Sequence, residues 1–288
     1  MSISKTRRLT TVVTVAITAA TALLVAAAPA SAVSGLTIVS AVTSSSSAAA
    51  KSISVACPAG KRVIGGGGIV DDADPDSKAF VTAMVPVSIA SGDRFDVAAM
   101  QPDDGYTGGW WLRSFAVCAK PSEGLQIISA TNTASSITSQ QHTVACPQGK
   151  RLLGAGGRVN NPAGQVALRA VRTDLAVGAK ATVNGHEDAD GYHGTWSLTS
   201  YAICVNPVPG LSIVTGKSAW DATTQKHATA TCAAGHSTHS ALYAITGGTG
   251  DAAIRVLHPS ANSVTAAARE LAGNSLNWSV TAIAVCAS

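Results

Sequence analysis

Three segments of this chain recur in the same order three times, and this repetition constrains the fold more than any other feature. The first segment opens with Gly-Leu, and the second places a cysteine after a short apolar stretch. The third follows the pattern W-x-[LV]-x-[SA]-[FYI]-A-[VI]-C and occupies 110–118, 196–204 and 278–286. The spacing defines a unit of about 85 residues. We expect a signal peptide at 1–32 and repeats at 33–122, 123–208 and 209–288, of which the last is divergent.

Within each repeat, apolar and polar residues alternate with period two and are interrupted by Gly, Pro, Asp and Asn, which predicts strands joined by turns. In the first repeat the expected strands are 36–42, 52–57, 62–70, 79–87, 94–100 and 110–118. The segment 266–271 is compatible with a single helical turn. The predicted fold is all-β. It is either three sandwich-like units in a row or one body with approximate threefold symmetry in which each repeat supplies a sheet.

The closing strand of each repeat predicts a tryptophan-anchored core and a disulfide. Alternate residues of a strand share a face, so Trp110, Trp196 and Trp278 lie on the same face as the cysteines that follow them and are expected in the core. Six cysteines allow fifteen pairings, but each repeat contains two at matching places. The predicted bonds are Cys57–Cys118, Cys146–Cys204 and Cys232–Cys286. Each closes a long loop and contributes about 4 kcal/mol in the chain-entropy model.

The first 32 residues indicate export. Lys5, Arg7 and Arg8 precede an uncharged apolar stretch that ends Ala30-Ser31-Ala32, as in a cleaved signal peptide. We therefore expect a secreted, extracellular protein, with no later membrane span. Removal of this segment takes three of the 20 basic residues and leaves 17 against 16 acidic ones. That balance argues against nucleic-acid partners and against binding to an anionic membrane surface.

No recognised catalytic motif is present, and we expect no catalytic residue. The chain has no G-x-S-x-G motif, and pairing accounts for every cysteine. The run Gly65 to Gly68 is not followed by G-K-[ST], so it indicates a strand with a bulge or a close backbone approach, not a phosphate loop. His236 and His239 have no third ligand nearby and are expected to be solvated.

Acidic residues concentrate in turns, where two kinds of site are conceivable. Asp72, Asp74 and Asp76 match alternate positions of a calcium loop, but Ser77 and Ala83 stand where that loop needs Gly and Glu. Ca²⁺ is therefore a weak alternative, and no cofactor is expected. The turn D-G-Y-x-G-x-W occurs in two repeats, and its aromatic and acidic side chains suit contacts with sugars. The candidate ligand-binding residues are Asp104, Tyr106, Trp111, Asp190 and Tyr192. The opposing interpretation is a tyrosine that packs on its own turn.

The Cys-Pro-x-Gly-Lys turn and the Trp-led strand ending Ala-[VI]-Cys resemble repeats of secreted actinobacterial β-proteins without an assigned activity. The resemblance covers most of the first two repeats and implies no catalytic site. The sequence therefore favours a non-catalytic binding protein for an extracellular polysaccharide or cell wall. The alternatives are a structural or protein-interaction module of the cell exterior, and a hydrolase or inhibitor whose site comes from distant residues.

Overall fold

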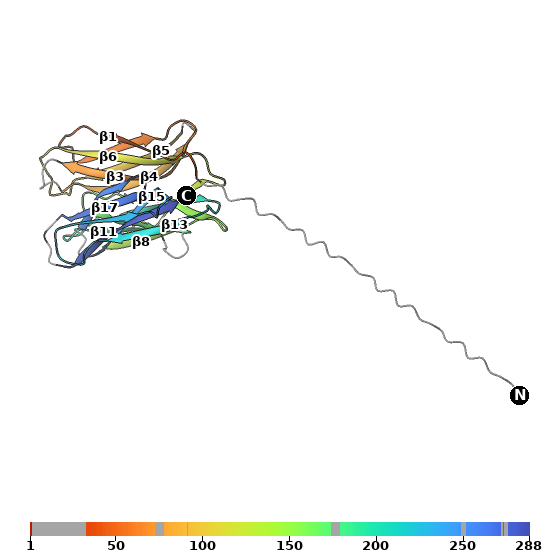
Figure 1. Cartoon of the computed structure of the whole chain (residues 1–288). Coiled ribbons are helices and arrows are strands. Elements are labelled where there is room, and N and C mark those ends of the chain that lie inside the picture. The colour runs from red at the N-terminus through yellow and green to blue at the C-terminus, as the bar shows by residue number, and fades with distance from the viewer. Residues whose placement is uncertain are drawn as a thin grey trace.

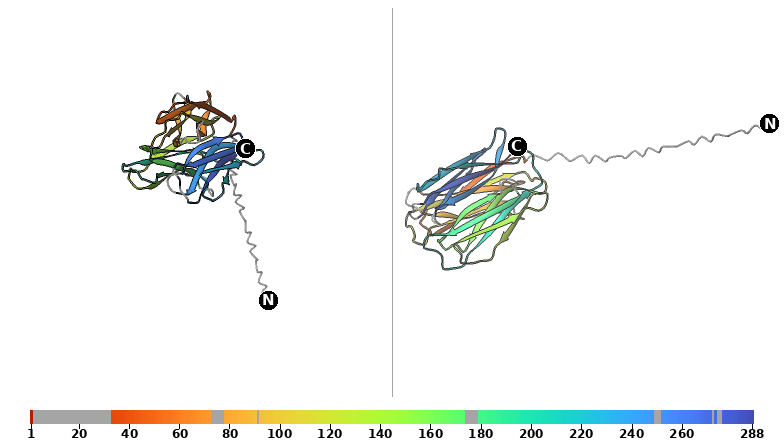
Figure 2. Two further views of the ribbon diagram at one scale, coloured as in Figure 1. Left: turned by 90° about the vertical axis from the view of Figure 1, so that its left-hand side faces the viewer. Right: turned by 90° about the horizontal axis from the view of Figure 1, so that it is seen from below.

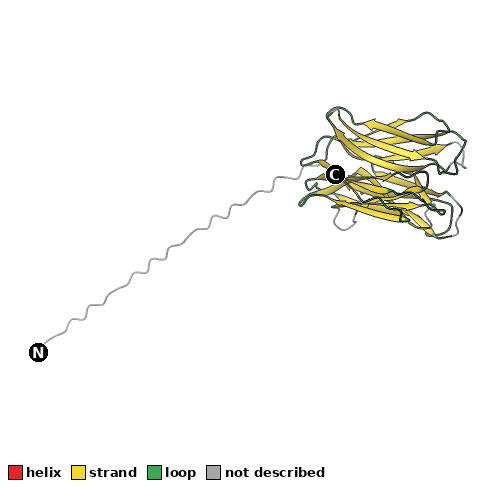
Figure 3. Cartoon of the chain, turned by 180° about the vertical axis from the view of Figure 1, so that it is seen from behind, coloured by secondary structure: helices red, strands yellow, loops and turns green. Residues whose placement is uncertain are grey.

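The computed structural model describes residues 1, 33–72, 78–90, 92–173, 179–248, 252–271, 273 and 276–288, except for the side chains of 71 and 72. The predicted signal peptide lies outside this part of the chain, apart from Met1. The described residues form eighteen strands. Figure 3 shows strands and loops in this part of the chain and no helix. The predicted all-β class is therefore confirmed.

Each repeat contributes six strands. The first has β1 (Thr37–Val42), β2 (Ala50–Ala56), β3 (Arg62–Asp72), β4 (Phe80–Ile89), β5 (Gly92–Met100) and β6 (Trp110–Ala119). The second has β7 (Gln126–Thr131), β8 (Ser139–Ala145), β9 (Arg151–Asn160), β10 (Val166–Thr173), β11 (Lys180–Glu187) and β12 (Ser197–Val205). The third has β13 (Ser212–Lys217), β14 (Gln225–Thr231), β15 (Ser237–Gly247), β16 (Ala252–Pro259), β17 (Ser263–Glu270) and β18 (Trp278–Ala287). The six strands expected in the first repeat are all present.

The single helical turn suggested at 266–271 is wrong, because these residues lie almost entirely in β17. Ala266 and Ala268 are buried while the residues between them are partly exposed, which is the period of a strand. β17 pairs with β14 on one side and β16 on the other. Pairing on both edges overrides the helical preference of the alanines.

The strands form three antiparallel six-stranded sheets, each shared by two repeats. Sheet A has the order β1-β6-β3-β16-β17-β14, sheet B has β2-β5-β4-β9-β12-β7, and sheet C has β13-β18-β15-β10-β11-β8. The first, sixth and third strands of a repeat enter one sheet, and its second, fifth and fourth strands enter another. The structure is therefore one body with approximate threefold symmetry. The expectation that each repeat supplies its own sheet is wrong.

Short inter-repeat strand pairings close this body into a ring. β3 pairs with β16, β9 with β4 and β15 with β10, each through two pairs of residues. Because β16 belongs to the third repeat and β3 to the first, the last repeat returns to the beginning of the chain. Figures 1 and 2 show the orange first repeat next to both the green second and the blue third.

The three predicted core tryptophans are at most 1% exposed. Each indole nitrogen donates a hydrogen bond: Trp110 Nε1 to Ala48 O at 2.9 Å, Trp196 Nε1 to Glu187 Oε1 at 2.8 Å, and Trp278 Nε1 to Thr223 O at 3.0 Å. Each indole therefore buries its ring and keeps a partner for its polar atom. The core prediction is confirmed.

All three predicted disulfides are present. Cys57 follows β2 of sheet B, whereas Cys118 belongs to β6 of sheet A. The same relation holds in the other two repeats, so each disulfide joins two different sheets. Together the three bonds link all three sheets.

The glycine run forms a bulged strand that lies against other repeats, as predicted. The ladder between β3 and β6 shifts between Val63 and Gly65. A Cβ atom at Gly65 would lie 2.5 Å from the carbonyl oxygen of His239, in the third repeat. Any larger residue there would push two repeats apart.

The third repeat lacks this glycine run because its core is packed differently. Gly68 faces Val97 in the first repeat, and Gly157 faces Val183 in the second. At the equivalent positions the third repeat has Tyr243 and Ala266, by the strand register. Tyr243 is fully buried and donates a hydrogen bond to Leu168 O at 2.7 Å. A large side chain on β15 thus occupies the space that a valine on the facing strand fills in the other two repeats.

His239 corrects the expectation that the third-repeat histidines are solvated. It occupies the position of Ile64 and Leu153 in the other repeats and is 1% exposed. Its Nδ1 lies 2.9 Å from Ser237 O, which accepts its hydrogen bond. Burial, and to a lesser extent the nearby His236, lower the pKa of His239 below its usual range. Burial therefore favours the neutral imidazole, which packs as a core side chain.

Candidate functional site

The two turns that carry Tyr106 and Tyr192, here called the tyrosine turns, each donate a backbone hydrogen bond to a buried side-chain oxygen. Tyr106 and Tyr192 are half-buried against the main core, and each ring lies directly over the glycine two residues later in the chain. The amide of Tyr192 donates to Glu187 Oε2 at 3.3 Å, and that of Tyr106 donates to Gln101 Oε1 at 3.2 Å. Both tyrosines therefore pack on their own turns.

Glu187 is a structural residue that the sequence analysis missed. It is 4% exposed, and its two carboxylate oxygens accept hydrogen bonds from Trp196 Nε1 and from the Tyr192 amide. The turn and the core tryptophan thus share one anchor. The sequence does contain a sign of this role: Gln101 and Glu187 stand at the same distance before the tryptophan of the closing strand in the first two repeats.

Asp104 and Asp190 lie on loops that the ring brings together at one end. Both are exposed and line a shallow cavity of about 280 Å³, together with Asp103 and Asp188. Lys78 pairs with Asp104 at 3.0 Å. Burial raises the pKa of Asp188 to about 7, with further contributions from Asp190 and Asp103. The cavity is therefore lined by acidic side chains, and the Asp188 carboxyl group is partly protonated near neutral pH.

The remaining predicted site residues lie elsewhere. Trp111 lies in β6, on the face of sheet A opposite the buried Trp110, and does not line this cavity. Asp74, Asp76 and the side chain of Asp72 lie outside the described residues. Within the part of the chain that is described, no three histidine, cysteine or acidic side chains are arranged to hold a metal ion.

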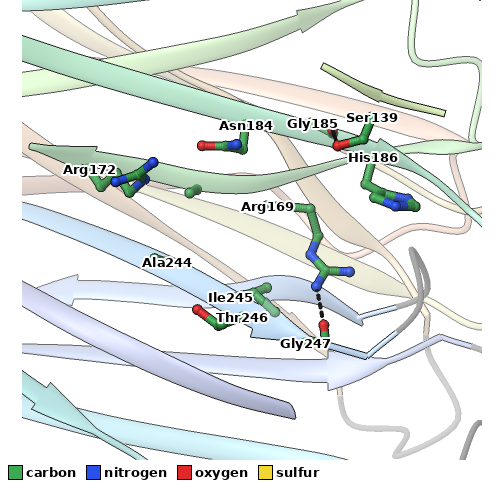
Figure 4. Close-up of a pocket in the computed structure, with 11 residues that line it drawn as sticks. Ser139, Arg169, Arg172, Asn184, Gly185, His186, Ala244, Ile245, Thr246 and Gly247 are labelled. Atoms are coloured by element: carbon green, nitrogen blue, oxygen red, sulfur yellow. Dashed lines mark hydrogen bonds between the residues drawn. The ribbon is translucent and has the colours of Figure 1, made fainter. Parts of the chain in front are cut away.

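A groove of about 420 Å³ lies on sheet C where the second and third repeats pair (Figure 4). Its walls come from β8, β10, β11 and β15. Arg169 stands at a bulge in β10, between Leu168 and Ala170. Its guanidinium spans the junction, and Nη2 donates to Gly247 O of β15 at 2.6 Å. A bulge redirects a side chain from its normal position on the sheet, and here it places an arginine in the groove.

The other groove residues present a mixture of hydrogen-bond donors and acceptors. Arg172 Nη2 and Asn184 Nδ2 both donate to Gln141 Oε1, at 3.3 and 3.1 Å. His186 Nδ1 donates a hydrogen bond to Glu187 O at 2.6 Å, which leaves Nε2 for another partner. Ser139 and Thr246 add hydroxyl groups to the lining. Such a surface can bind a ligand rich in hydroxyl groups.

An exposed tryptophan stands next to this groove. Trp220 is 51% exposed, and the edge of its ring contacts Gly247, which lines the groove. Lys217 Nζ lies 5.6 Å from the centre of that ring. A large exposed aromatic side chain next to a polar groove is a common feature of sugar-binding proteins because the ring packs against the apolar face of a sugar.

The pair of arginines that lines the groove is not kept at the equivalent positions of the other two repeats. By the register of the bulges, Thr82 and Arg255 occupy the position of Arg169 in the other repeats. Val85 and His258 likewise replace Arg172. The three repeats therefore share a core and differ on their outer faces. The groove could not be found from one repeat, because its walls come from two.

Comparisons with known proteins add no functional assignment. No protein-family model matches the chain, and no curated protein is significantly similar to it. Within the described residues, no helix has the length and apolarity needed to cross a membrane.

Proposed function

We propose that this chain is a secreted, non-catalytic binding protein that holds an extracellular polysaccharide in the groove on sheet C. The observation that carries the proposal is the groove itself, which combines hydroxyl, amide, imidazole and guanidinium groups beside the exposed Trp220. Polysaccharide ligands require many directed hydrogen bonds and a flat apolar contact. The three disulfides are compatible with an extracellular location.

The arrangement of cysteines supports a role in binding over thiol catalysis. All six are in disulfides, so none supplies a free thiol. The tyrosine turns contribute less to this proposal than the groove does, because their rings pack on their own glycines. The proposed ligand site is therefore the groove and not the loops.

Retention on insoluble polysaccharides tests the proposal. The mature protein is mixed with a panel of purified polysaccharides and cell walls, and the bound fraction is compared with that of Arg172→Ala/Asn184→Ala. Loss of retention in this variant, with normal retention of Tyr106→Ala/Tyr192→Ala, is the expected result. Loss only in the tyrosine variant would move the site to the loops. Absence of retention by the wild type would refute polysaccharide binding.

The edges of the sheets favour a second candidate, a structural or protein-interaction module. Each sheet ends in two edge strands, and such strands present unpaired backbone groups that can bind another chain. Val42, at the end of edge strand β1, is 51% exposed, and Ile137, just before edge strand β8, is 59% exposed. Concentration-dependent assembly in analytical ultracentrifugation, without retention on any polysaccharide, would support this candidate.

A further inference from the structure

A row of aromatic and basic side chains crosses the outer face of sheet A. Trp111, Arg113 and Phe115 are alternate residues of β6 and share the face opposite the buried Trp110. The Arg113 guanidinium lies 5.3 Å from the centre of the Trp111 ring and 5.9 Å from that of Phe115. The ring of His258, from β16, lies 4.7 Å from the Phe115 ring. The row thus joins the first repeat to the third.

Arg113 has its hydrogen-bond donors available. Within the described residues, its guanidinium makes no hydrogen bond and no ion pair. Other arginines of the body differ, because Arg62 binds Asp93 at 2.7 Å and Arg94 binds Asp96 at 2.9 Å. The Nε atom of Arg113 is buried and has no partner, so a ligand from solvent would meet the Nη groups. A partly buried guanidinium with unused donors is suited to bind an anion.

The aromatic neighbours hold this arginine in place. Contact with two ring systems favours one position of the guanidinium through cation–π attraction and restricts its rotamers. Less side-chain entropy is then lost when an anion binds. The ordered arginine therefore resembles a preformed binding group.

His258 adds a second donor to the same place. Its imidazole is half-buried and makes no hydrogen bond within the described part of the chain. Burial lowers the pKa of His258, and the positive charge of Arg113 lowers it further. Arg113 and His258 lie 5.9 and 4.7 Å from the centre of the same Phe115 ring, so both belong to one patch.

We propose that the outer face of sheet A binds the anionic group of an acidic polysaccharide, a carboxylate or a sulfate. Arg113 binds the oxyanion through its paired donors, His258 beside Phe115 donates a second hydrogen bond, and the half-buried Trp111 contacts the sugar ring. This site is separate from the groove on sheet C, because the two share no residue and lie on different sheets. It extends the proposed function to charged ligands.

Affinity electrophoresis tests the site in gels that contain polygalacturonate, dextran sulfate or neutral dextran. We expect the wild type to be retarded by an acidic polymer and not by dextran. Arg113→Gln should weaken the apparent affinity about tenfold, as expected for the loss of one charge-assisted pair. Comparison of the two acidic polymers shows whether the site takes carboxylate or sulfate.

Matched variants separate a built site from general charge attraction. Arg94→Gln removes the same charge from an arginine that already pairs with Asp96, and it should change the affinity less than twofold. Arg113→Lys keeps the charge but loses the forked geometry, and it should bind more weakly than the wild type. Equal effects of Arg113→Gln and Arg94→Gln would overturn the proposal, as would absence of binding to both acidic polymers.

Two further controls keep this result interpretable. Circular dichroism melting of each variant checks the fold, and Arg113→Lys tests the site if Arg113→Gln is unstable. Arg172→Ala/Asn184→Ala is measured both in the acidic gels and on the insoluble panel, so that a loss confined to the panel reports on the groove alone. Failure of the groove proposal is thereby distinguished from failure of the site on sheet A.

Discussion

Removal of a single disulfide should lower the stability of the whole body. Cys146→Ala/Cys204→Ala deletes the bond that joins the end of β8 in sheet C to β12 in sheet B. The two cysteines are 58 residues apart, so the chain-entropy model gives a loss of about 4 kcal/mol. For a body of this size, the corresponding fall in melting temperature is about 8–16 °C.

The shape of the unfolding transition is the decisive measurement. Because every sheet contains strands of two repeats, the variant should still unfold in one step by calorimetry and by circular dichroism. The same deletion in the first or third repeat, with separations of 61 and 54 residues, should have nearly the same effect. A separate early transition with about a third of the unfolding enthalpy would refute the interlocked architecture. An unchanged melting temperature would refute the estimate of the disulfide contribution.

Three other predictions concern the core. Burial lowers the pKa of His239 in the folded protein below the ordinary value of 6.5, so the unfolded chain takes up a proton first as the pH falls. The free energy of unfolding should therefore decline below about pH 6.5. His239→Leu should flatten this decline, as measured by urea unfolding between about pH 7.5 and pH 5. Gly68→Val should cost about 1–3 kcal/mol in chemical denaturation, because the added side chain meets Val97, which already lies 2.7 Å from a Cβ at that position. Glu187→Ala should cost about 1–3 kcal/mol and change the fluorescence of Trp196, whereas Glu187→Gln, which keeps an acceptor, should cost less.

Local features of the chain were predictable because they depend on neighbours in sequence. The strands of the first repeat, the three core tryptophans and the disulfides follow from period-two alternation and from the matching positions of the repeats. The bulged glycine strand was predictable for the same reason. The tryptophans and the cysteine pairs occur at matching positions in all three repeats, so each repeat independently supports the same structural assignment.

The sharing of sheets could not be predicted, because strand alternation is the same whichever strand lies alongside. β4 shows the same pattern whether its neighbour is a strand of its own repeat or β9 of the next. The choice depends on a few residue pairs at each junction and on the packing of glycines against other repeats. Such contacts are distant in sequence and leave no local pattern.

The functional surfaces were harder to predict for a related reason. The groove on sheet C and the row on sheet A both combine residues from two repeats, so no single segment contains either. Trp111 was named as a candidate, but His258, whose ring contacts Phe115 of the same row, lies in the third repeat. His239 was taken for a solvated residue because its apolar equivalents, Ile64 and Leu153, become apparent only when the repeats are aligned strand by strand.

The closing of the ring has a consequence for the order in which this protein folds. A chain is synthesised from its N-terminus, and β3 belongs to the first repeat while its partner β16 belongs to the last. Until the final repeat emerges, one side of β3 remains without its neighbour and is open to pairing with another chain. The first two repeats can join through β4 and β9 beforehand. A nascent chain truncated before β16 should therefore be more prone to aggregation than the complete protein, although it already contains two whole repeats.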